Sequence, residues 1–176
     1  MIIGPESTGK STLCGQLAEH FQTEWVPEFA REYLDEHGMD YTYEDLLTIA
    51  KGQIELENHF LTGFDDKSEI KNHKPKIFID TDMYVMKVWC EFVFGKCHHW
   101  VIDQIVERNY DLYLLCNIDL PWVPDKLREY PDLKRREQLY KMYKDIMINQ
   151  NVPWVEISGD SDARLKTAIE AVNRFS

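Results

Sequence analysis

The sequence predicts an α/β fold in which helices flank a doubly wound, parallel sheet of five strands. Three observations lead to this prediction. A glycine-rich loop lies directly between an apolar run and an amphipathic stretch, in the order strand, loop, helix. Short apolar runs without polar alternation recur along the chain, as in strands whose sheet is covered on both faces. Segments with helical apolar spacing separate these runs, which is typical of parallel strands joined by crossover helices.

The expected strands are short and are followed by polar or turn-forming residues. The first has only three apolar residues before the loop, which suggests that the natural chain starts upstream. Pro27 ends the second strand, and the third runs directly into Asp80. The strands are expected at residues 1–3, 24–26, 77–80, 112–116 and 154–157.

Helices are expected where apolar residues recur three or four positions apart. Leu13, Leu17 and Phe21 mark the first helix, and Gly38 is a natural stop for the second. Residues 62–76 are polar and show no such spacing, so we expect a loop or a frayed helix end there. The helices are expected at residues 10–21, 28–37, 43–61, 82–94, 98–108 and 133–150, with a closing helix marked by Leu165, Ile169 and Val172.

The glycine-rich loop is a complete G-x-x-x-x-G-K-[ST] phosphate loop, which makes the expected fold that of a P-loop NTPase. Gly4 and Gly9 let successive N–H groups point at a phosphate, and the following helix N-terminus adds a positive field. Lys10 is expected to reach the β- and γ-phosphates, and the Ser11 hydroxyl to bind Mg²⁺. An ordinary glycine-rich turn with a surface lysine is the alternative. The residues expected to bind ATP are Gly4, Pro5, Glu6, Ser7, Thr8, Gly9, Lys10, Ser11 and Thr12.

Composition limits the classes of function. The chain has 176 residues, of which 44% are hydrophobic and 29% charged, as in a single globular domain spanning residues 1–176. A net charge of −11 and only short basic clusters argue against a nucleic-acid partner. No apolar run approaches the ~20 residues of a membrane span, and no leader is apparent, so we expect a cytoplasmic protein.

The four cysteines show no C-x-x-C pair and no zinc-finger spacing. Reduced thiols are therefore expected at Cys14, Cys90, Cys97 and Cys116. The run 97–99, Cys-His-His, is either a group of metal ligands or the ordinary start of a helix.

Two carboxylates follow the third expected strand. Asp80 has the position of a Walker B aspartate and is expected to hold Mg²⁺ directly or through water. Asp82 lies two residues further, at the carboxyl end of the sheet, where ligands bind in open α/β folds. It is expected to contact Mg²⁺ or orient a substrate, with capping of the next helix as the alternative.

A glutamate and an arginine open the helix after the second expected strand. Glu28 and Arg31 are three residues apart, which places both on one helix face near the carboxyl end of the sheet. Glu28 is expected to hydrogen-bond to a substrate hydroxyl or accept its proton, with Arg31 beside it at the substrate. A surface ion pair at a helix start is the alternative.

Residues 119–136 are polar, pinned by prolines and rich in arginine, and we interpret them as a lid over the phosphates. Arg128, Arg135 and Arg136 are expected to stabilise charge on ATP, unless the arginines, above all the last two, merely face solvent. Trp122 is expected either to stack on a substrate ring or to fill an apolar gap. After the last expected strand, Ser158 is placed either beside the purine base or at the cap of the final helix.

Four parts of the chain carry a family resemblance: GPESTGKST at 4–12, PEFAREY at 27–33, FIDTD at 78–82, and the DLPW that opens 119–128 together with VEISG at 155–159. In these the chain resembles the ribosylnicotinamide kinase domain of the NadR family, among small AAA-type P-loop proteins. The resemblance implies transfer of the ATP γ-phosphate to the 5′-hydroxyl of nicotinamide riboside, giving nicotinamide mononucleotide. It also implies that Trp122 lies near the nicotinamide or nucleoside pocket. The lid departs from the family pattern at Lys126, where a glycine is expected.

The sequence therefore predicts an ATP-dependent small-molecule kinase with a nucleoside-like substrate and Mg²⁺ as cofactor. No Asn-Lys-x-Asp guanine motif is present, which favours ATP over GTP. Two alternatives stay open: a kinase acting on another nucleoside-like substrate or a nucleotide, and a regulatory P-loop ATPase acting through a protein partner. Nothing in the sequence indicates an oligomeric state.

Overall fold

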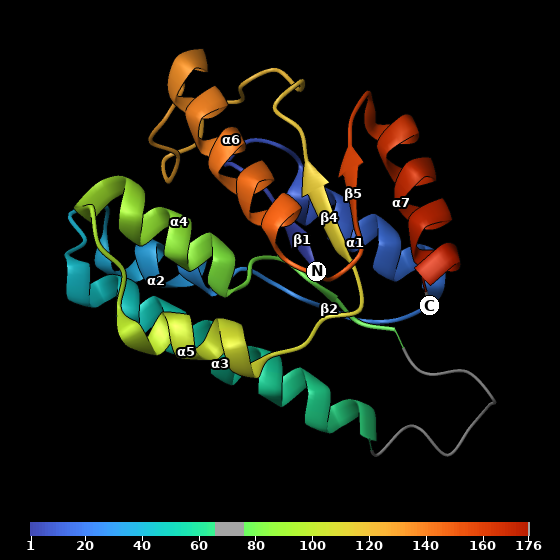
Figure 1. Cartoon of the computed structure of the whole chain (residues 1–176), viewed down its shortest axis with the longest axis horizontal. Coiled ribbons are helices and arrows are strands. Elements are labelled where there is room, and N and C mark those ends of the chain that lie inside the picture. The colour runs from blue at the N-terminus through green and yellow to red at the C-terminus, as the bar shows by residue number, and fades with distance from the viewer. Residues whose placement is uncertain (66–75, 176) are drawn as a thin grey trace.

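A layer of parallel strands lies between two layers of helices in the computed structural model, which describes residues 1–65 and 76–175 (Figure 1). The carboxyl ends of the strands point to the end of the molecule where the segment before α6 arches over them (Figure 1). This is the layered α/β arrangement that the alternating apolar runs predict.

The strands form two parallel ladders that meet at a single bridge. β1 (Ile2–Ile3) pairs with β4 (Tyr113–Cys116), and β4 pairs with β5 (Trp154–Ile157). β2 (Trp25–Val26) pairs with β3 (Phe78–Ile79), and a parallel bridge between Ile2 and Asp80 gives the order β2-β3-β1-β4-β5. The parallel fold is confirmed, but the five strands do not form one continuous sheet, because β1, β2 and β3 are too short to extend the ladder past this bridge.

Helices cover both faces of the strand layer. α1 (Lys10–Phe21) and α7 (Ser161–Phe175) pack on one face, and the other face carries α3 (Tyr43–Asp65), α4 (Met83–Phe94) and α6 (Leu133–Asn149) (Figure 1). Two shorter helices lie outside this layer, where α2 (Phe29–His37) packs on α3 and α5 (His99–Glu107) packs on α4.

The helix bounds agree with the predicted ones to within a few residues, except at the end of α3. That helix continues to Asp65, so residues 62–65 are helical where a loop or a frayed end was expected. Thr62 and Gly63 are exposed, and an exposed helix turn needs no apolar face, so the loss of apolar spacing did not mark where the helix stops. The remainder of the predicted loop, residues 66–75, lies outside the described residues.

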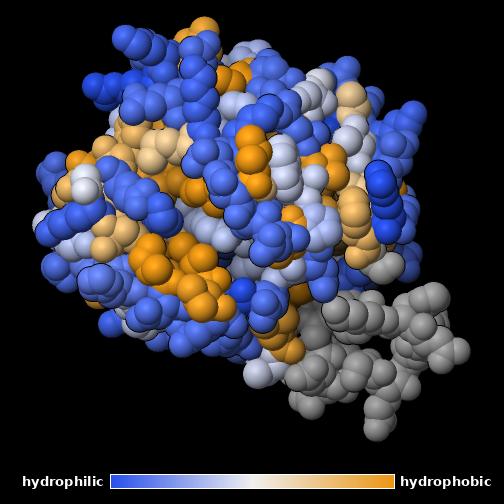
Figure 2. Space-filling model, viewed as in Figure 1, coloured by the Kyte–Doolittle hydropathy of each residue, from blue (hydrophilic) through white to orange (hydrophobic). Residues whose placement is uncertain are grey.

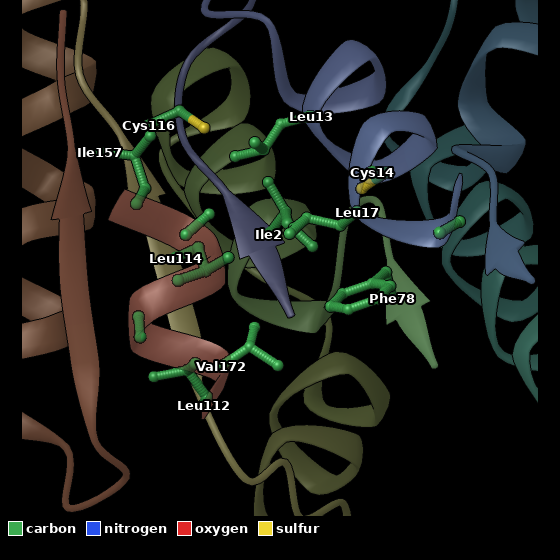
Figure 3. Close-up of a cluster of buried hydrophobic side chains, with 13 residues drawn as sticks. Ile2, Leu13, Cys14, Leu17, Phe78, Leu112, Leu114, Cys116, Ile157 and Val172 are labelled. Atoms are coloured by element: carbon green, nitrogen blue, oxygen red, sulfur yellow. The ribbon is translucent and has the colours of Figure 1, made fainter. Parts of the chain in front are cut away.

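Neighbouring residues of each strand face opposite helix layers. Ile2 and Leu114 point toward α1 and α7 and pack with Leu17 (Figure 3). Ile3 and Leu115 belong instead to the cluster that includes side chains of α4 and α6. Burying each such side chain contributes roughly 1.5–3 kcal/mol to folding. Because both faces are apolar, the strands appear in the sequence as continuous apolar runs.

A third apolar cluster joins α2, α3, α4 and α5 beside β2, with Leu46, Ile49 and Met86 fully buried in it. Polar side chains cover most of the surface in Figure 2, and apolar side chains show between the helices. This cluster fixes α2 and α4 next to the carboxyl ends of β2 and β3, where they form one side of a cleft.

Candidate active site

The phosphate loop connects β1 to α1 and lines the cleft over its whole length, from Gly4 to Thr12. Gly4 has a φ of +139°, and a Cβ there would lie 2.7 Å from the carbonyl oxygen of Cys116, so only glycine fits this close approach. Gly9 is also left-handed, at +77°, and is the N-cap of α1. The loop is thus shaped by its two glycines, as the motif predicts.

Internal hydrogen bonds hold the loop in this shape. The hydroxyl of Thr8, which is buried, donates to the carbonyl oxygen of Pro5 at 2.7 Å. The ammonium of Lys10 donates to the same carbonyl at 3.2 Å. The amino group of Lys10 therefore lies inside the curve of the loop, where it faces the space lined by backbone N–H groups.

Ser11 and Asp80 bring a hydroxyl and a carboxylate together below the loop. The Ser11 hydroxyl donates to Oδ2 of Asp80 at 2.5 Å. Among the described residues, the buried Oδ1 of Asp80 has no hydrogen-bond partner. Burial, and secondly the charge of Glu28, raises the pKa of Asp80 to about 6. A hard oxygen donor pair with one unsatisfied buried oxygen fits a Mg²⁺ ligand set.

Glu28, the N-cap of α2, and Arg31 in its first turn both line the cleft. Glu28 accepts a hydrogen bond from the hydroxyl of Thr81 at 3.2 Å. Arg31 is half exposed and pairs with Asp125 of the lid at 3.2 Å. The two residues are thus neighbours at the cleft, as their spacing predicts, and the arginine also touches the lid.

Gln53 of α3 fixes the turn that carries Glu28, and the sequence analysis missed it. Its side chain is fully buried, accepts from the backbone N–H of Phe29 at 2.8 Å and donates to the carbonyl oxygen of Pro27 at 3.2 Å. Gly52 beside it leaves room for the ring of Phe29, because a Cβ there would lie 2.2 Å from Cε1. A polar residue at a buried position of the apolar helix face was the available signal.

Asp82 makes the contacts of a helix cap, the alternative to a contact with Mg²⁺ or substrate. Its Oδ1 accepts from the backbone N–H of Val85 and caps α4, and its Oδ2 accepts from the hydroxyl of Tyr113 at 2.9 Å. Asp82 is fully buried and does not line the cleft. Burial raises its pKa to about 6. The capping alternative describes these contacts.

The lid, residues 119–136, contributes Arg128 to the cleft. Its Nη1 donates to the Ser7 hydroxyl at 3.4 Å and to the carbonyl oxygen of Val123 at 2.5 Å. Arg135 lies elsewhere, exposed and over the ring of Tyr130 at 5.6 Å. Of the three predicted lid arginines, only Arg128 lines the cleft, because Arg135 is exposed and Arg136 is buried elsewhere.

Trp122 and Ser158 do not line the cleft. The ring of Trp122 lies 5.5 Å from the guanidinium of Arg136, which is buried and donates to carbonyl oxygens of the lid. Ser158 is exposed at the end of β5, and Asp160 rather than Ser158 caps α7, by accepting from the N–H of Ala163. Trp122 is therefore half-buried beside Arg136 of the lid and outside the cleft.

Arg164 of α7, also missed by the sequence analysis, links three elements near the phosphate loop. It is buried, donates to the carbonyl oxygens of Thr8 at 3.1 Å and Asn117 at 3.0 Å, and forms an ion pair with Asp119. Its guanidinium thereby connects the first turn of α7 to the phosphate loop and to the residues that follow β4.

The far half of the cleft is an apolar chamber that the sequence did not indicate. The whole cleft has a volume of about 310 Å³. Side chains from α2, the segment after it, α4, α6 and the lid meet in the chamber, and they are far apart in the sequence. They are Leu34, Met39, Val85, Val88, Trp89, Phe92, Leu127, Leu139 and Tyr143.

Cys97 and His98 make structural contacts only: the Cys97 thiol donates to the carbonyl oxygen of His98, and the His98 ring bonds to the carbonyl of Tyr43. Within residues 1–65 and 76–175 no group of three or more His, Cys, Asp or Glu side chains is arranged to hold a metal. No helix in the same part of the chain is long and apolar enough to cross a membrane.

The AAA domain family matches residues 1–164. The chain belongs to this family. Two curated proteins, the trifunctional NAD biosynthesis/regulator proteins NadR of Salmonella typhimurium and Escherichia coli, are each 30% identical to the chain over 179 aligned positions. That alignment covers 99% of this AAA domain chain but 42% of each relative, so the chain spans less than half of their length.

Two solved structures share the fold of this AAA domain. A crystal structure of NadR protein in complex with NR has a TM-score of 0.75 and 21% identity, covering 99% of this chain and 49% of that one. A second, of NadR protein in complex with NAD and AMP-PNP, has a TM-score of 0.69 at the same identity and covers 48% of the NadR chain. The P-loop α/β fold is therefore confirmed independently of the strand assignments.

Proposed function

We propose that this chain transfers the γ-phosphoryl group of ATP to the 5′-hydroxyl of nicotinamide riboside. The observation that carries the proposal is the continuity of one cleft, in which a phosphate loop and an apolar chamber adjoin. Glu28 lines the same cleft, and we assign to it the hydrogen bond to the acceptor hydroxyl. A P-loop ATPase without an acceptor needs no such chamber.

The relatives support the acceptor. The curated relatives act in NAD biosynthesis by their names, and solved NadR proteins hold NR in one case and NAD with AMP-PNP in another. We take NR to be nicotinamide riboside. A pyridinium ring is a flat cation, and the aromatic side chains Trp89, Phe92 and Tyr143 of the chamber offer the faces that bind such a ring.

In the proposed reaction, the 5′-oxygen forms a bond to the γ-phosphorus as the bond from that phosphorus to the β–γ bridging oxygen breaks. ADP leaves with the electron pair of the broken bond, and the proton of the 5′-hydroxyl passes to the carboxylate of Glu28. Because the transition state of phosphoryl transfer is loose, holding the hydroxyl in line matters more than strong base strength.

Cationic groups take up the charge of the transferring group. Lys10 reaches the β- and γ-phosphates from inside the loop, and Arg128 closes over them from the lid. Ser11 and Asp80 would hold Mg²⁺. When bound, that ion neutralises the β- and γ-oxygens.

The test is a coupled ADP-release assay with Mg-ATP, with and without nicotinamide riboside, followed by mass spectrometry of the products. The expected result is ADP release that depends on the riboside, with nicotinamide mononucleotide formed in equal amount. Glu28→Gln is expected to abolish most transfer while AMP-PNP still binds. ADP release that ignores the riboside would contradict the proposal and favour a different acceptor or a partner-coupled ATPase.

A further inference from the structure

The side-chain carboxylate of Glu6 holds the lid to the phosphate loop. Both oxygens of the Glu6 side chain accept from the backbone N–H of Glu129, at 3.0 and 3.1 Å, and Oε1 also accepts from the N–H of Tyr130 at 2.5 Å. Next to it, the Ser7 hydroxyl accepts from the N–H of Val123 at 3.1 Å. Glu6 and Ser7 thus accept hydrogen bonds from two separate parts of the lid backbone.

Glu129 of the lid is also connected by hydrogen bonds to the apolar chamber, the proposed acceptor site. The indole N–H of Trp89, which lines the chamber, donates to the hydroxyl oxygen of Tyr41 at 2.9 Å. The Tyr41 hydroxyl then donates to Oε2 of Glu129 at 2.8 Å. An indole N–H can only donate, so the direction of this chain of hydrogen bonds is fixed. Burial raises the pKa of Tyr41, which keeps the phenol protonated as the donor.

Glu129 is therefore the meeting point of the two connections, through its backbone N–H on one side and its carboxylate on the other. The negative charge of Glu6 in the phosphate loop would repel a nucleotide if no hydrogen-bond donor stabilised it. Its partial burial raises its pKa, and the two lid N–H groups oppose that shift by stabilising the ionised form. The negative charge of Glu6 is thus directed at the lid backbone.

We propose that Glu6 and Tyr41 are positioning residues that hold the lid from its two sides, the phosphate loop and the acceptor chamber. Through them Arg128, which bonds to Ser7 in this lid position, stays over the phosphate loop. The effect on turnover rests on the proposed kinase function, but the lid position itself does not depend on any acceptor.

Amide hydrogen exchange tests the proposal without an acceptor. We would compare the full chain with Glu6→Ala, Glu6→Gln and Tyr41→Phe, each in the presence of Mg²⁺ and AMP-PNP. The N–H groups of Glu129 and Tyr130 are expected to exchange about tenfold faster in Glu6→Ala and severalfold faster in Tyr41→Phe, with Glu6→Gln between them because its single oxygen can still accept. Tyr33→Phe is the matched control, since it also removes one phenol–carboxylate bond, to Asp45, outside the cleft.

Peptides from β4 report in the same experiment whether each variant is folded. If Glu6→Ala fails that check, Glu6→Gln and Tyr41→Phe still decide the question. Lid N–H groups that stay as protected in these variants as in the original chain would overturn the proposal, as would equal acceleration in Tyr33→Phe. Should riboside phosphorylation be absent while the lid responds as expected, the proposed function would fail and the positioning role would stand.

In turnover, a positioning role predicts that Tyr41→Phe lowers kcat with riboside about tenfold while the affinity for AMP-PNP stays within twofold. A tyrosine that merely stabilises the fold would lower the amount of active protein and leave kcat per folded molecule unchanged. An unchanged kcat per active site would therefore contradict the proposal.

Discussion

One continuous stretch, residues 4–12, forms the phosphate half of the cleft, whereas the apolar chamber, which we propose as its acceptor half, is assembled from α2, the segment after it, α4, α6 and the lid. In the phosphate half, neighbours in sequence are neighbours in space, and two glycines shape the backbone that carries the chemistry. In the acceptor half, Trp89 and Tyr143 line one chamber from different helices. The comparison teaches that the class of reaction is encoded locally, while the choice of acceptor depends on tertiary packing.

The largest expected effect is on the phosphate half. Lys10→Ala removes the cation inside the loop, and we expect kcat to fall roughly 1000-fold or more because charge on the transferring group is no longer offset. The measurement is product formation under saturating acceptor. Lys51→Ala, which removes an exposed lysine lying over Trp100, is the control and is expected to change kcat less than twofold. Equal losses in both variants would contradict the assignment.

The next effect concerns the pH dependence of stability without ligands. Asp80 and Asp82 have pKa values of about 6 in the fold against a usual 3.8, so the native state holds more protons between pH 4 and 6. Stability is therefore highest below pH 4 on account of these groups and falls as pH rises through about 6. Each contributes roughly 2–3 kcal/mol to that fall.

Asp80→Asn is expected to remove about half of this pH-dependent loss, as measured by urea unfolding at several pH values between 4 and 8. The same variant is expected to lose phosphoryl transfer, because the site loses the carboxylate that would hold Mg²⁺. An unfolding free energy with the same pH dependence as the original chain would show that Asp80 is not the titrating group.

In the acceptor half, Trp89→Ala is expected to raise the KM for nicotinamide riboside about 10- to 100-fold, which corresponds to about 1.4–2.8 kcal/mol. The KM for ATP is expected to stay within threefold, because Trp89 belongs to the chamber and not to the loop. Trp122→Ala tests the family resemblance, which implies that this tryptophan lies near the nucleoside pocket. In the structure Trp122 lies on Arg136 outside the cleft, so we expect a smaller change in the KM for the riboside. A larger effect at Trp122 than at Trp89 would place the riboside ring at the lid instead.

The smallest effect concerns how the fold places Glu28. Gly52→Ala forces the Phe29 ring to move, at a cost of about 1–3 kcal/mol that is partly offset by better helix propensity. We expect a modest net loss in Tm, with a severalfold drop in kcat because Glu28 precedes Phe29. Gly63→Ala in the same helix meets no atom within 4 Å and is expected to be neutral or stabilising. The opposite order of Tm values would rule out the packing argument.

The sequence predicted what depends on local order and missed what depends on contacts between elements. The phosphate loop, the strand that ends at Asp80 and most helix bounds follow from motif and periodicity. For Asp82 the sequence left two roles open, because a helix cap and a catalytic carboxylate follow a strand in the same way. Gln53 lies on the apolar face of its helix, and its hydrogen bonds to the turn around Glu28 depend on how α3 meets β2.

The aromatic residues show the same limit. Trp122 and Trp89 are both tryptophans in segments that flank the carboxyl ends of strands, and composition does not separate them. The packing of the helices places Trp89 of α4 in the lining of the cleft, whereas Trp122 lies beside the buried Arg136 of the lid.

The most direct measurement of the central claim is a crystal structure of the chain with nicotinamide riboside and AMP-PNP. We expect triphosphate in the loop of residues 4–12, the pyridinium ring in the chamber against Trp89, and the 5′-oxygen between Glu28 and the γ-phosphate. A riboside ring stacked on Trp122, or an empty chamber with nucleotide bound, would contradict the division of the cleft into a phosphate half and an acceptor half.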